Sequence, residues 1–94
     1  MMEHKLLLVD DDRDLLEMLC SIFRRAGYTD LVTASSGQEA LQIWREQQPA
    51  LIVLDVMMPG MDGFEVLREI RRTSHVPVLM LTARGEAEDR IEGL

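Results

Sequence analysis

The sequence predicts an α/β fold, a doubly wound open parallel sheet with helices on both faces. Strand-like and helix-like segments alternate along the 94 residues, which is typical of a parallel sheet. Three of the strand candidates are continuous apolar runs, as expected of strands that helices cover on both sides. Each of these runs ends on a polar residue. Since a closed barrel of eight such units needs far more chain, an open sheet is expected.

The first strand is expected at Lys5–Val9, directly before three consecutive aspartates. Apolar residues then recur at helical spacing from residue 13 to 26, which predicts a helix. Asp12 or Asp14 would cap the start of this helix, and Gly27 would end it.

The second strand is expected at Leu31–Ala34. Ser36 and Glu39 have the spacing of a capping box and predict the start of a second helix. This helix would pack Trp44 against the sheet and would end before Pro49.

The third strand is expected at Leu51–Leu54, and Asp55 is the first polar residue after it. The sequence Met58-Pro59-Gly60 then forces a turn. Asp62 and Glu65 predict a capping box at the start of a third helix. The methionines around this turn are interpreted as packing groups.

The fourth strand is expected at Val78–Thr82, and a helical stripe begins at Ala87. No internal repeat, linker or low-complexity segment is evident, so residues 1–94 are interpreted as one domain.

Composition excludes several classes of function. The net charge of −7 argues against direct binding of nucleic acid or an anionic membrane by this segment, and it is compatible with binding a cation. Cys20 is the only cysteine, so no internal disulfide can form. No apolar run approaches the about 20 residues of a membrane span, and no signal peptide precedes the first strand, so a cytoplasmic domain is expected.

Polar residues end three of the predicted strands, namely Asp10-Asp11, Asp55 and Thr82. Parallel strands bring their carboxyl ends to one edge of the sheet, where ligands of open α/β sheets bind. Closely packed carboxylates repel one another unless a cation lies between them. Mg²⁺ prefers such oxygen ligands, and a carboxylate beside it would act as a nucleophile toward phosphorus.

The motifs VDDD at residues 9–12, LDVMMPGMDG at 54–63 and PVLMLTA at 77–83 resemble the receiver domain of two-component response regulators. The resemblance implies a flavodoxin-like fold with strand order 2-1-3-4-5. It also implies that Asp55 accepts a phosphoryl group from a sensor histidine kinase. Mg²⁺ would be bound by Asp11, Asp55 and the Met57 backbone carbonyl, and by Asp10 largely through water. Thr82 would contact the phosphoryl group and act as a switch.

The same resemblance implies how the domain would act within a longer protein. The last fourteen residues are most similar to receivers that precede a winged-helix DNA-binding domain, which implies a C-terminal effector domain. The domain would be a stoichiometric phosphoryl acceptor with at most slow self-dephosphorylation, not an enzyme.

The chain lacks the fifth strand, its lysine and the fifth helix of receivers, so a truncated receiver is expected. Val78–Thr82 would then form a sheet edge that favours a homodimer. Side chains such as Leu15, Leu19 and Ile22 are expected to be less well covered.

Two alternatives remain open. One is an interaction domain of the same fold that works without phosphorylation, although such a domain would typically have lost the Asp10-Asp11 pair. The other is a metal-dependent phosphohydrolase, but these enzymes commonly have a second carboxylate at the position of Met57.

Overall fold

A computed structural model describes residues 4–58 and 60–81 of the chain. Strands and helices alternate along the described residues. In chain order, they are β1 (Leu6–Val9), α1 (Arg13–Arg25), β2 (Leu31–Ala34), α2 (Gly37–Gln47), β3 (Leu51–Asp55), α3 (Gly63–Arg71) and β4 (Val78–Leu81). Each predicted strand and helix in this range is present, and the helix expected from Ala87 lies outside the described residues.

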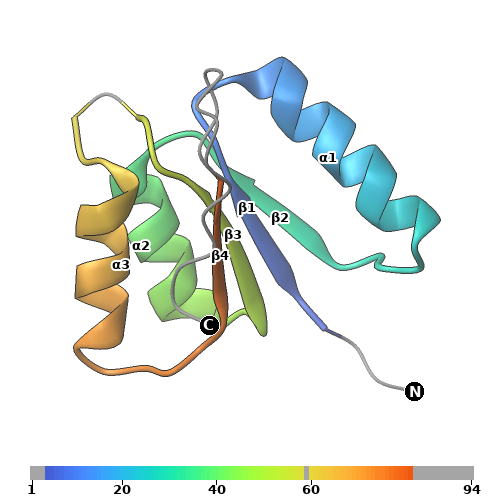
Figure 1. Cartoon of the computed structure of the whole chain (residues 1–94). Helices are drawn as coiled ribbons and strands as arrows, with labels where there is room; N and C mark the ends of the chain where they lie inside the picture. The colour runs from blue at the N-terminus through green and yellow to red at the C-terminus, as the bar shows by residue number, and fades with distance from the viewer. Residues whose placement is uncertain (1–3, 59, 82–94) are drawn as a thin grey trace.

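The four strands form one parallel sheet in the order β2-β1-β3-β4. This order agrees with the flavodoxin-like arrangement predicted for the first four strands. Figure 1 shows α1 on one face of the sheet and α2 and α3 on the other. The register pairs Val9 with Leu54, so the residues that follow, Asp10 and Asp55, leave neighbouring strands at the same level.

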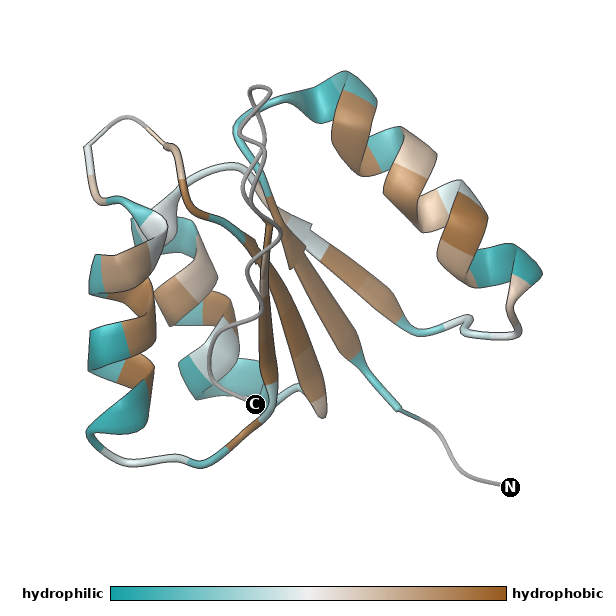
Figure 2. Ribbon diagram, in the orientation of Figure 1, coloured by the Kyte–Doolittle hydropathy of each residue, from teal (hydrophilic) through white to brown (hydrophobic). Residues whose placement is uncertain are grey.

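Two apolar layers hold the helices to the sheet. Strand side chains on the α2–α3 side include Leu7, Val9, Ile52, Leu54, Val78 and Met80. On the α1 side, Leu8 and Val53 pack with Leu16 and Cys20. Figure 2 shows β1, β3 and β4 largely in the apolar colour, whereas β2 has a pale segment. Burial on both faces explains why these strands are apolar runs and not alternating ones.

Local hydrogen bonds explain where the helices begin. Asp12 caps α1, since its side chain accepts from the amides of Asp14 and Leu15. Ser36 accepts from the amide of Glu39 at 3.1 Å and caps α2. Both halves of the predicted capping box of α3 are present.

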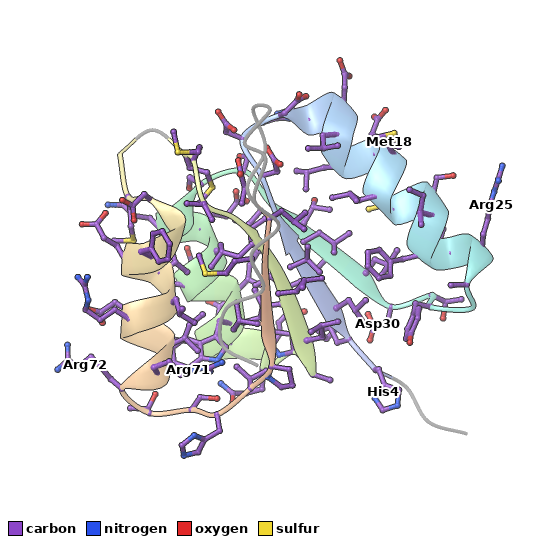
Figure 3. The ribbon with its side chains drawn as sticks, in the orientation of Figure 1. His4, Met18, Arg25, Asp30, Arg71 and Arg72 are labelled. Atoms are coloured by element: carbon purple, nitrogen blue, oxygen red, sulfur yellow. The ribbon has the colours of Figure 1, made fainter. Side chains whose placement is uncertain are left out.

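Some of the residues predicted to pack in the core are buried, and others are exposed. Trp44 and Met58 are buried as predicted, but the Met57 side chain is 55% exposed, so its interpretation as a packing group is wrong. On α1, Leu15 and Leu19 are half-buried and Ile22 is 53% exposed, as expected for less well covered side chains. Figure 3 shows Met18 on the outer side of the same helix. Among the described residues, no helix has the length and apolar character needed to cross a membrane.

Candidate functional site

Three carboxylates meet at the carboxyl ends of β1 and β3. One oxygen from each of Asp10, Asp11 and Asp55 lies within 4.8 Å of the others. Asp10 and Asp55 are buried, at 3% and 1% exposure, whereas Asp11 is exposed. The structure therefore brings together the three aspartates predicted from the sequence, with one of them open to solvent.

Backbone hydrogen bonds orient the two buried carboxylates. Asp10 accepts from the amide of Asp12 at 2.9 Å, which turns the chain from β1 into α1. Asp55 Oδ1 accepts from the amide of Met57 at 3.2 Å, which turns the chain after β3. Both contacts join a residue to the one two positions later, as in Asx-turns.

The cluster is electrostatically costly without a counter-charge. The pKa of Asp10 is raised from 3.8 to about 6, chiefly by burial and also by the charges of Asp55 and Asp11, while the hydrogen bond from the amide of Asp12 opposes the shift. A hard divalent cation would relieve this repulsion. The donor set of three carboxylates fits Mg²⁺, which prefers oxygen ligands.

An open hollow lies beside the exposed carboxylate. It is lined by Asp11, Val56, Met57, Met58, Gly60, Asp62 and Phe64. The side chains of Met57 and Phe64 are 55% and 42% exposed. Sequence reasoning missed Phe64, because its position fits the apolar stripe of α3 and nothing local signals that its ring stays exposed.

Of the other predicted site residues, Met57 is described by the structure and Thr82 is not. Met57 lies two residues after Asp55, and its amide contacts that carboxylate. Thr82 lies outside the described residues. Lys5, the only lysine in the sequence, donates to Asp30 at 3.0 Å, at the end of the sheet where the strands begin. Figure 3 places Asp30 and His4 at that end.

The raised pKa of Asp10 predicts how the stability of the metal-free protein changes with pH. The folded state holds a proton on Asp10 up to about pH 6, whereas the unfolded state loses it near pH 3.8. The stabilisation that Asp10 contributes to the folded state is therefore fully present below pH 3.8 and is lost as pH rises through 6. The loss is expected to be on the order of 3 kcal/mol, at 1.36 kcal/mol per pKa unit.

Urea unfolding between pH 3.5 and 7 with a chelator present measures this effect. In Asp10→Asn, the part of the pH dependence that comes from Asp10 should disappear. Equal pH profiles for the two proteins would contradict the assignment.

Comparison with known proteins identifies the family. Residues 6–94 match the response regulator receiver domain. A CpxR homolog from Haemophilus influenzae, a transcriptional regulatory protein, is 54% identical over 90 residues, covering 96% of this chain and 39% of that protein. The probable transcriptional regulator ycf27 of Porphyra purpurea is 49% identical over 92 residues, covering 98% of this chain and 37% of that protein. The chain thus spans well under half the length of these relatives.

Solved structures agree with this match. Vibrio cholerae chemotaxis protein CheY4 has a TM-score of 0.82 and 35% identity, covering 92% of this chain and 73% of that one. The Francisella response regulator 1452 receiver domain has a TM-score of 0.83 and 34% identity, covering 97% and 75%. The chain belongs to the response regulator receiver domain family.

Proposed function

We propose that this domain is a phosphorylation-dependent signalling switch in which Asp55 accepts a phosphoryl group from a phosphohistidine of a sensor histidine kinase. The observation that supports it best is the cluster of Asp10, Asp11 and Asp55, with ligand atoms within 4.8 Å of one another, in a chain of the receiver family. Asp55 is the last residue of β3, and Asp10 and Asp11 directly follow the neighbouring strand β1.

Each residue of the site has a role in this proposal. Asp10, Asp11, Asp55 and the Met57 backbone carbonyl would hold Mg²⁺. When bound, Mg²⁺ would supply positive charge against the carboxylates and the oxygens of the phosphoryl group. Thr82 would contact the phosphoryl group and act as the switch. The exposed position of Asp11 suits a ligand that faces an arriving phosphodonor.

The proposed transfer is a displacement at phosphorus. An Asp55 carboxylate oxygen forms the new P–O bond while the P–N bond to imidazole breaks. The imidazole nitrogen leaves with the electron pair and is then protonated. The amide of Met57, 3.2 Å from Oδ1, holds the carboxylate in one orientation for this step.

The domain would accept one phosphoryl group per chain, with at most slow self-dephosphorylation. The phosphorylated domain would control an effector domain elsewhere in the protein. A DNA-binding effector is proposed because relatives of this chain are named as transcriptional regulators. A cytoplasmic setting and dependence on a kinase partner belong to the same proposal.

Treatment of the full-length protein with acetyl phosphate and Mg²⁺ tests it. Intact-mass measurement should find one phosphoryl adduct per chain, and release of inorganic phosphate should stay slow. Rapid release over many turnovers would favour the phosphohydrolase alternative. No adduct and no release would favour an interaction domain that works without phosphorylation.

A further inference from the structure

The segment between β3 and α3 joins the proposed phosphoryl acceptor to one of its proposed metal ligands. It starts at Val56, directly after Asp55, and includes Met57 and Met61 before α3 begins at Gly63. The position of the Met57 carbonyl relative to the three carboxylates therefore depends on how this segment is held.

Gly63 holds the segment to the end of β3. Its amide donates to the carbonyl of Val56 at 3.0 Å. A Cβ at this position would lie 2.5 Å from the carbonyl oxygen of Asp55 and 2.8 Å from Cα of Val56. Real Cβ atoms do not approach other heavy atoms below about 3.0 Å, so a side chain here would push α3 away from the acceptor residue.

A second contact comes from α2. Gly37 is the first residue of α2, and a Cβ there would lie 3.0 Å from the Met61 carbonyl oxygen and 2.9 Å from Cγ2 of Val66. Val66 is fully buried, and the Met61 oxygen belongs to the backbone, so neither has room to yield. Any side chain at residue 37 would therefore move the segment and the start of α3 away from α2.

The start of α2 is itself fixed. Ser36 caps the helix, and Glu39 accepts from the backbone amide of Ser35 at 2.9 Å. The strand before it is tied to the cluster, because the amide of Asp10 donates to the carbonyl of Ala34 at 3.1 Å. Gly37 thus links a rigid helix start beside β1 to the segment that carries Met57.

We propose that Gly37 is a positioning residue for the metal and phosphoryl site. By allowing α2 to approach Met61 and Val66, it sets the position of the start of α3. The Gly63 amide there holds the carbonyl of Val56, the residue before Met57, so the position of the Met57 carbonyl relative to the three carboxylates follows from this contact. This inference rests on the proposed function, since it assumes that the Met57 carbonyl is a metal ligand.

The test compares Gly37→Ala with Gly27→Ala in the full-length protein. Gly27 ends α1, has a φ of +105° and would place a Cβ in open space, so alanine there strains the backbone without touching the site. Mg²⁺ titration by calorimetry should give an affinity about tenfold weaker for Gly37→Ala, the size of effect seen when a residue that orients a metal ligand is changed. Gly27→Ala should bind as the wild type does.

A second measurement needs no metal. In the presence of a chelator, the amide resonances of Met57, Met61 and Gly63 should shift in Gly37→Ala and keep their positions in Gly27→Ala. If the wild type binds Mg²⁺, equal affinities and unshifted amides in a folded Gly37→Ala would overturn the inference. If the wild type binds no Mg²⁺, the proposed function fails, and the amide shifts alone decide whether Gly37 positions the segment.

A second variant serves if Gly37→Ala does not fold. In Gly37→Ala/Val66→Ala, the nearest obstructing atom, Val66 Cγ2, is removed, while the contact with the Met61 oxygen remains. This protein should bind Mg²⁺ more weakly than Val66→Ala alone. Equal affinities of the two would overturn the inference.

Discussion

Replacing Asp55 by asparagine is expected to abolish the phosphoryl adduct that acetyl phosphate and Mg²⁺ form on the full-length protein. Asparagine has nearly the shape of aspartate, so the buried site at the end of β3 should keep its packing. Its amide is a poor nucleophile toward phosphorus, and the acid-labile acyl phosphate cannot form. Intact-mass measurement before and after acid treatment gives the result.

Asp62→Asn is the matched control. Asp62 lies in the same β3–α3 connection and caps α3, and asparagine caps helices about as well as aspartate. This variant should take up one phosphoryl group as the wild type does. A full adduct on Asp55→Asn would mean that another residue is the acceptor.

The Asp11→Asn variant is expected to bind Mg²⁺ at least about tenfold more weakly, since a hard cation loses a charged oxygen ligand. Asp11 is the exposed member of the cluster, so its replacement should change the fold little. Calorimetric titration of the full-length protein with Mg²⁺ measures the change.

Asp14→Asn controls for the loss of one negative charge. Asp14 is exposed in the first turn of α1, three residues further along the chain, and is not one of the clustered carboxylates. Its variant should bind Mg²⁺ with nearly the wild-type affinity. An unchanged affinity in Asp11→Asn would exclude Asp11 as a ligand.

Patterns that act over a few residues were readable in the sequence. A strand buried on both faces must be apolar throughout, so an apolar run such as Leu51–Leu54 predicts a buried strand. Helix caps join residues three apart, which is why Ser36 and Asp62 predict the starts of α2 and α3. The convergence of Asp10, Asp11 and Asp55 followed from these strands, because parallel strands end at a common edge.

Features that depend on packing between distant segments were not readable. The exposure of Met57 depends on what lies opposite the β3–α3 connection, and hydrophobicity alone suggested burial. The pKa of Asp10 depends on how deeply the strand end is enclosed. Gly37 and Gly63 begin α2 and α3, and their close contacts are with backbone and side chains of other segments, which local sequence patterns do not place.

The position of Lys5 has a practical consequence for spectroscopy. Lys5 carries the only ε-amino group in the sequence, and its side chain is partly exposed at the end of the sheet opposite the three carboxylates. An amine-reactive fluorophore attached there would sit one sheet length from the proposed phosphoryl site. Such a label would report tumbling or partner binding by this domain while leaving the access of small phosphodonors to Asp55 unobstructed.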